Sequence, residues 1–159
     1  MITSFLTVLL FSVLANPKVT AKLDLLARIF LGILFLMAGL GKLTAPQLTQ
    51  DLMTTIGMSD IFFYPTVIFE IIGGLMLIVG FKSRLAAAAL AGFTIAASIL
   101  FHNDFGDRAQ IGMFLKNIAV AGGLVMLAKH GSQSFSLDGL FGKEEAGSSM
   151  EANAQNPVE

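Results

Sequence analysis

Four apolar stretches, each about as long as a helix that crosses a bilayer, constrain this chain more than any other feature. They run over Leu25–Gly41, Ile61–Phe81, Leu85–Phe101 and Ala109–Ala128. Only 13% of the 159 residues are charged, against about 25% in an ordinary soluble domain. A soluble bundle needs a polar face on every helix, and these stretches are apolar all round. The sequence therefore predicts an all-α, polytopic membrane protein, an antiparallel bundle of four transmembrane helices.

Segments outside this bundle domain, which we predict over residues 23–130, differ in composition. Residues 1–22 begin with the apolar run Ile2–Ala15, which is short for a span and predicts an interfacial helix. A signal peptide is the weaker alternative, because no basic residue precedes the apolar part. Residues 131–142 predict an amphipathic cytoplasmic segment. Residues 143–159 lack apolar periodicity and predict a disordered tail.

Basic residues predict the orientation of the spans. Most of them flank the same ends of the apolar stretches: Lys18, Lys22, Arg28, Lys82, Arg84, Lys129 and Lys143. Basic residues concentrate on the cytoplasmic side of membrane proteins. We therefore expect a multi-pass membrane protein, in contact with the lipid bilayer, with both termini in the cytoplasm.

Composition excludes several kinds of chemistry. There is no cysteine, which rules out disulfides, thiol catalysis and thiolate metal sites. The formal net charge of −1 gives no argument for nucleic acid as a partner. No nucleotide-binding, metalloprotease or serine-hydrolase motif is present. The sequence thus contains no autonomous catalytic motif.

Glu70 is the only charged residue in Ile61–Phe81, and a carboxylate deep in a bilayer is costly without a partner. At 1.5 Å per residue it lies roughly 12–14 Å below the outer surface. Lys116 and Asn117 lie at a similar depth in the fourth span, with Lys42 and His102 nearer the outer surface. We expect Lys116 to be the partner of Glu70.

Two interpretations of this polar cluster remain open. In one, Glu70 and Lys116 form a closed ion pair that fixes helix register and binds nothing. In the other, the cluster lines a pocket that opens outward and binds a ligand. The candidate ligand-binding residues are Lys42, Glu70, His102, Lys116 and Asn117.

Three further predictions concern single residues. Arg28 enters close to the inner surface and is expected to snorkel there. His102 with Asp104 and Asp107 is too weak a pattern to predict a metal site. Five glycines are expected to let neighbouring helices pack closely, namely Gly39, Gly73, Gly74, Gly122 and Gly123.

Together, these motifs resemble those of the DoxX family over about residues 23–140. The resemblance rests on Arg28, Gly39–Lys42 (GLGK), Glu70–Gly74 (EIIGG), Gly80–Arg84 (GFKSR), Phe101-His102, Phe114–Asn117 (FLKN) and Phe135–Asp138 (FSLD). It implies a four-helix inner-membrane protein. Related members are subunits of a thiosulfate:quinone oxidoreductase, and others are placed in membrane redox or oxidative-stress complexes.

The resemblance implies an accessory subunit of a redox system, in which the polar cluster binds a quinone-like headgroup beside a redox partner protein. Without cysteines, the electron carrier must be a quinone or a cofactor of the partner. The alternative is a non-enzymatic scaffold, either docking a partner or forming a homo-oligomer, with purely structural buried charges. Solute transport is disfavoured, because no inverted repeat is visible.

Overall fold

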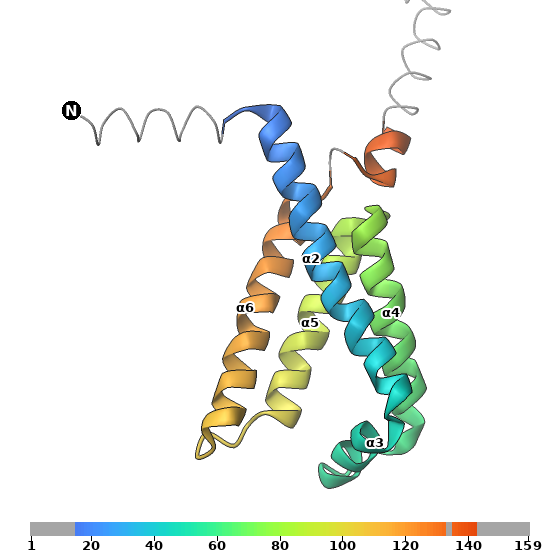
Figure 1. The fold of residues 1–159 in the computed structure, drawn as a ribbon, viewed down its shortest axis with the longest axis vertical. Coiled ribbons are helices and arrows are strands. Elements are labelled where there is room, and N and C mark those ends of the chain that lie inside the picture. The colour runs from blue at the N-terminus through green and yellow to red at the C-terminus, as the bar shows by residue number, and fades with distance from the viewer. Residues whose placement is uncertain (1–14, 133–134, 143–159) are drawn as a thin grey trace, which may run out of the picture.

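The computed structural model describes residues 15–132 and 135–142. Four long helices dominate the described chain: α2 (Pro17–Thr44), α4 (Phe63–Val79), α5 (Ser83–Phe101) and α6 (Arg108–His130). They run up and down, each antiparallel to the next (Figure 1). All four are long and apolar enough to cross a membrane, with the short 3₁₀ helix η1 (Asp60–Phe62) extending the second span. The predicted all-α bundle of four transmembrane helices is confirmed.

Two of the sequence predictions fall mainly outside this part of the chain. Most of the apolar N-terminal segment (residues 1–14) and the whole predicted tail (residues 143–159) lie outside the described residues. Residues 135–142 are described, and 137–142 form a short helical segment. In Figure 1 this segment lies at the end of the bundle where α4 turns into α5.

The helix ends follow from local sequence. Asn16 caps α2 by accepting a hydrogen bond from the Lys18 amide at 3.0 Å, and Pro17 occupies the first turn, where its missing N–H is harmless. Asp107 caps α6 in the same way, accepting from the Ala109 amide at 2.8 Å. Gly80 ends α4 in the left-handed conformation with φ 68°, a conformation that glycine adopts without a Cβ penalty.

The helices associate mainly as two pairs, α2 with α4 and α5 with α6. In the α2–α4 pair, glycines bring the backbones into contact. A Cβ at Gly74 would lie 2.7 Å from the Gly32 carbonyl oxygen and 2.9 Å from the Leu36 nitrogen. The shared core of the two pairs contains buried side chains from all four helices, among them Phe35, Leu77, Leu90 and Leu124.

A fifth helix, α3 (Pro46–Thr55), follows α2 and is an element that the sequence prediction lacks. Its Met53 packs in a second small core with Phe63 and Val67 of α4. We call the end of the bundle that holds α3 the α3 end. The opposite end, with the α4–α5 turn at residues 80–82, is the Lys82 end.

The helix α6 is buried unevenly along its length. Its buried residues are Ala121, Leu124 and Leu127, all in the half nearer the Lys82 end. From Arg108 to Val120 the helix has no buried residue. This half of α6 therefore presents most of its surface outward.

Candidate functional site

The intramembrane carboxylate of Glu70 is paired with Lys42. The Lys42 ammonium donates to Glu70 Oε1 at 2.8 Å and to Oε2 at 2.7 Å. The Glu70 side chain is 6% exposed, whereas the Lys42 side chain is 23% exposed. The nearly buried Glu70 side chain is thus paired with a lysine side chain that remains partly exposed.

Helix geometry explains why these two side chains meet. Every Cα–Cβ bond in a helix tilts toward the helix N-terminus. Lys42 lies in the last turn of α2, so its side chain tilts back toward the membrane centre. Glu70 lies on the antiparallel α4, so its side chain tilts the opposite way, toward the α3 end. Gly39 allows the close approach, because a Cβ there would come within 3.4 Å of Glu70 Cβ.

The prediction that Lys116 pairs with Glu70 is wrong. Lys116 is exposed, and it lies in the half of α6 that buries nothing. The helix α6 packs mainly against α5 and has only minor contacts with α2. Depth along the membrane normal was a poor guide here, because it says nothing about which helices are neighbours.

The other predicted cluster members also lie apart from the ion pair. His102 is half-buried just after α5, and its Nδ1 is hydrogen-bonded to Oε1 of Gln110 at 2.8 Å. Asn117 is half-buried on α6. Of the five predicted ligand-binding residues, the structure brings together Lys42 and Glu70.

The loop carboxylates near His102 have local roles. Asp104 Oδ1 accepts a hydrogen bond from the Gly106 amide at 2.9 Å, and Asp107 caps α6. Within the described ranges, no group of three or more histidine, aspartate or glutamate side chains is arranged to hold a metal ion.

The predicted packing glycines fall into two groups. Gly39 and Gly74 lie where α2 touches α4, and a Cβ at Gly73 would lie 2.9 Å from Leu90 of α5. Gly123 has only ordinary contact distances, with Leu31 atoms 3.8 Å or more from the added Cβ, and a Cβ at Gly122 would meet nothing within 4 Å. A side chain at Gly122 would therefore enter space that the described chain leaves open.

Arg28 is buried rather than snorkelling to the surface. Its side chain is 0% exposed. It donates to the Phe135 carbonyl at 2.9 Å and to Asp24 at 3.2 Å, with longer contacts of 3.5 Å to the carbonyls of Leu77 and Ile78. The snorkelling prediction fails because the C-terminal end of α4 and residue 135 cover the guanidinium group, and their carbonyls replace water as acceptors.

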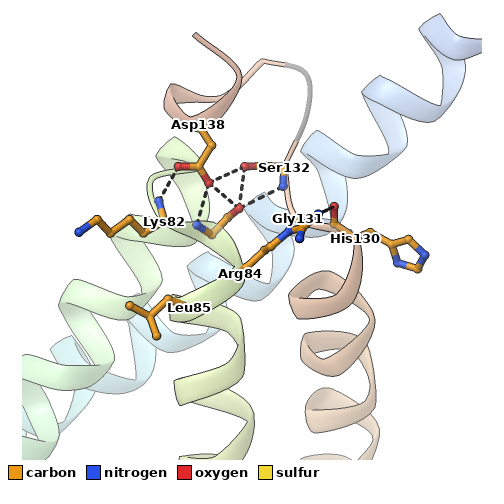
Figure 2. Close-up of a pocket in the computed structure, with 8 residues that line it drawn as sticks. Lys82, Arg84, Leu85, His130, Gly131, Ser132 and Asp138 are labelled. Atoms are coloured by element: carbon orange, nitrogen blue, oxygen red, sulfur yellow. Dashed lines mark hydrogen bonds between the residues drawn. The ribbon is translucent and has the colours of Figure 1, made fainter. Parts of the chain in front are cut away.

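Asp138 is a functional-site candidate that the sequence analysis named only within a motif. Its carboxylate accepts from the backbone amides of Lys82 and Ser83 at 2.7 and 2.9 Å, and from the hydroxyls of Ser83 and Ser132 at 2.8 and 3.2 Å (Figure 2). A carboxylate in this position caps the N-terminus of α5 and matches its dipole. In the sequence, the signal that could have identified this cap is an aspartate after the last span, combined with a serine at the first position of α5.

This hydrogen bonding predicts how Asp138 responds to pH. Burial raises the pKa of Asp138, but the hydrogen bonds from Ser83, Lys82 and Ser132 outweigh that effect and hold it below its ordinary value of 3.8. A depressed folded-state pKa stabilises the fold above the ordinary value, and the stabilisation is lost as the pH falls through the folded-state pKa. We expect Asp138→Asn to lower the stability by about 1 kcal/mol at neutral pH.

Thermal unfolding of the detergent-solubilised protein between pH 8 and pH 4.5 tests this prediction. The difference in melting temperature between wild type and Asp138→Asn should stay constant across that range. A difference that vanishes between pH 7 and pH 5 would contradict the assignment of a low pKa to Asp138.

The part of the chain that contains Lys42 and Glu70 matches a known protein family. The DoxX family model matches residues 23–103, which cover most of α2, all of α3 and α4, and α5. "Inner membrane protein YqjF" of Escherichia coli (strain K12) is 38% identical over 120 residues, 76% of this chain and 92% of the relative. The chain belongs to the DoxX family. The resemblance inferred from the sequence is confirmed.

A second relative is also named as an inner-membrane protein. "Inner membrane protein YphA" of Escherichia coli (strain K12) is 27% identical over 121 residues, 72% of this chain and 86% of the relative. No solved structure is significantly similar to the chain. With its four apolar helices, the chain is a DoxX-family inner-membrane protein. The family match contains both Lys42 and Glu70, whereas Asp138 lies beyond it.

Proposed function

We propose that this DoxX-family protein is an accessory subunit of a membrane redox or oxidative-stress system. In this proposal, Lys42 and Glu70 form the polar site for the headgroup of a lipid-soluble quinone. One observation carries the proposal: the Lys42 side chain is 23% exposed, while the Glu70 side chain that it pairs with is 6% exposed. An ion pair of this kind, inside a membrane and partly open, is a functional candidate by default.

The hydrogen-bond donors of the Lys42 ammonium suit a quinone headgroup. A lysine ammonium has three donors, and Glu70 accepts two of them. The third is available to a quinone carbonyl oxygen. Reduction of a quinone takes up two electrons and two protons, and the electrons must come from a redox partner protein. The contribution of this chain would be to orient the headgroup and to supply hydrogen bonds and a proton.

We also propose that both termini face the cytoplasm. Basic residues of the described chain gather at the Lys82 end, namely Lys18, Lys22, Arg28, Lys82, Arg84 and Lys129. This asymmetry supports a cytoplasmic Lys82 end under the positive-inside rule. The Lys42–Glu70 pair would then lie in the periplasmic half of the bundle.

A thermal-shift experiment tests the quinone proposal. A short-chain quinone added to the detergent-solubilised protein should raise the melting temperature of wild type by several degrees, because a ligand that binds the folded state stabilises it. The double variant Lys42→Met/Glu70→Met should lose that shift. Decanol serves as the ligand control, because it has an alkyl chain but no quinone ring.

A matched control variant is Lys116→Met. It also removes a membrane-level lysine, but one that lies on the outward face of α6. It should keep the full shift. The proposal is wrong if wild type shows no shift, or if the double variant shifts as much as wild type does.

A second candidate function is favoured by Lys116. This lysine is exposed, about 12 Å along α6 from Arg108. A lysine at that depth is costly against lipid. No residue of α6 from Arg108 to Val120 is buried in the described structure. This supports a docking face here for a membrane partner that carries a carboxylate. In that case the protein would act as a scaffold, and Lys42–Glu70 would be structural.

Site-specific photo-crosslinking in cells separates the two functions. A crosslinker placed at Leu115 or Ala119, on either side of Lys116, should yield one defined product if the protein is a scaffold. The same crosslinker at Leu85, which is exposed at the other end of the bundle, is the control. Heterogeneous products at all three positions would count against the scaffold, and a product of twice the chain mass would identify a homo-oligomer.

A further inference from the structure

A pocket of about 340 Å³ lies at the Lys82 end, outside the site proposed above. Its walls come from the start of α5, the end of α6 and the segment that follows it. The lining residues are Lys82, Ser83, Arg84, Leu85, His130, Gly131, Ser132 and Asp138. Figure 2 shows them around the α4–α5 turn. This pocket is open on one side rather than enclosed.

The single acidic group in the lining is already satisfied. Asp138 accepts four hydrogen bonds, two from backbone amides and two from serine hydroxyls. Its negative charge is therefore directed at the N-terminus of α5. The other ionisable lining groups are Lys82, Arg84 and His130, so the part of the pocket that remains available for a ligand is basic.

Two of these basic side chains are fixed by their surroundings. Arg84 donates to the His130 carbonyl at 3.2 Å. It packs against Gly131, where a Cβ would lie 2.6 Å from Arg84 Nε. That bond uses one of the five guanidinium donors, and the remaining donors can bind an anion. His130 Nδ1 donates to the Met126 carbonyl at 2.8 Å, which fixes the orientation of the ring.

The pocket also has an apolar edge. Leu85 lines it and is 64% exposed, as the third residue of the membrane-spanning helix α5. In Figure 2 the Lys82 side chain extends to one flank of the turn, while Arg84 and His130 lie on the other. Basic groups at the end of a span, beside an exposed leucine, match a ligand with an anionic head and an apolar chain.

We propose that this pocket binds the phosphate group of an anionic phospholipid. The phosphodiester would lie against the guanidinium group of Arg84, and an acyl chain would run along Leu85. The Lys82 ammonium would add positive charge from the other flank of the turn. Basic pockets beside membrane helices attract anionic headgroups through charge, and each lysine or arginine near the surface contributes to that attraction. This site is distinct from Lys42–Glu70, which lies at the level of the last turn of α2 on the far side of the core.

Lipid titration in a neutral detergent tests the proposal, with native mass spectrometry or thermal shift as the readout. Phosphatidylglycerol should bind wild type at least tenfold more tightly than phosphatidylcholine does. Lys82→Gln and Arg84→Gln should each weaken phosphatidylglycerol binding by roughly fivefold. Lys82→Gln should not disturb the Asp138 cap, because that hydrogen bond comes from the Lys82 backbone nitrogen.

The matched control is Lys129→Gln, which removes the same charge at the same end of the bundle but outside the pocket lining. It should leave the affinity unchanged within about twofold. Equal binding of the two lipids, or an equal loss in Lys129→Gln, would overturn the proposal in favour of diffuse surface attraction. Displacement of the lipid by an equal concentration of inorganic phosphate would also overturn it, because the site would then be one for free phosphate.

Discussion

Lys42→Met should destabilise the protein by about 3–5 kcal/mol, the largest single effect that we predict. The substitution leaves the Glu70 carboxylate, which is 6% exposed, without its ion-pair partner. Removing one member of a buried pair costs this much because the remaining charge is uncompensated. Reversible unfolding in detergent and denaturant measures the change in the free energy of unfolding.

The double variant Lys42→Met/Glu70→Met should recover most of that loss. Replacing a whole buried ion pair by apolar side chains of similar size is often neutral, since it also removes the cost of desolvating both charges. Lys116→Met is the control and should change the stability by less than about 0.5 kcal/mol. If Lys116→Met were as destabilising as Lys42→Met, the pairing in the structure would be wrong.

Gly74→Ala should destabilise the protein by about 3 kcal/mol, at the upper end of the cost of overpacking. The new Cβ would meet backbone atoms, the Gly32 oxygen at 2.7 Å and the Leu36 nitrogen at 2.9 Å. Backbone cannot rotate away as a side chain can, so α2 must move away from α4. The melting temperature and the yield of folded protein report the effect.

Gly122→Ala provides the matched control for Gly74→Ala. Both glycines lie inside transmembrane helices, but a Cβ at Gly122 would meet nothing within 4 Å. Alanine favours a helix over glycine by about 1 kcal/mol, so this variant should be neutral or slightly more stable. A large loss of stability in Gly122→Ala would indicate that α6 packs against another molecule at this position.

Much of the fold could be predicted from the sequence because it depends on length and polarity. A run of about 20 apolar residues has few folded alternatives to a transmembrane helix. The short helix α3 was missed, since its composition is mixed and only Met53 is buried. Its packing depends on contacts with α4 that local sequence does not reveal.

The candidate site was predicted less well, for a geometrical reason. The rise per residue gives the depth of a side chain, but neither its direction around the helix nor the neighbouring helix. Lys116 and Glu70 were placed at a similar depth, yet Lys116 lies on the exposed half of α6, which packs mainly against α5. The backward tilt of Cβ atoms would have favoured Lys42, because it brings the side chains of Lys42 and Glu70 toward each other.

Arg28 and Asp138 illustrate a second limit of sequence reasoning. Both are satisfied by groups from distant parts of the chain, Arg28 by the Phe135 carbonyl and Asp138 by the Lys82 and Ser83 amides. The amphipathic pattern of residues 131–142 does not reveal these partners. In the structure the polar residues Ser136 and Asp138 contact the bundle end, while Phe135 and Leu140 are exposed.

The location of the Lys42–Glu70 pair has a consequence for biosynthesis. Both residues belong to the first helical hairpin, α2 to α4, which is synthesised before α5 and α6. A lysine and a glutamate that neutralise each other within one hairpin can enter the lipid together, at a lower cost than two separate charges. The hairpin does not have to wait for the later helices to compensate its carboxylate. The Asp138 cap, by contrast, becomes available only after all four membrane-spanning helices have been synthesised.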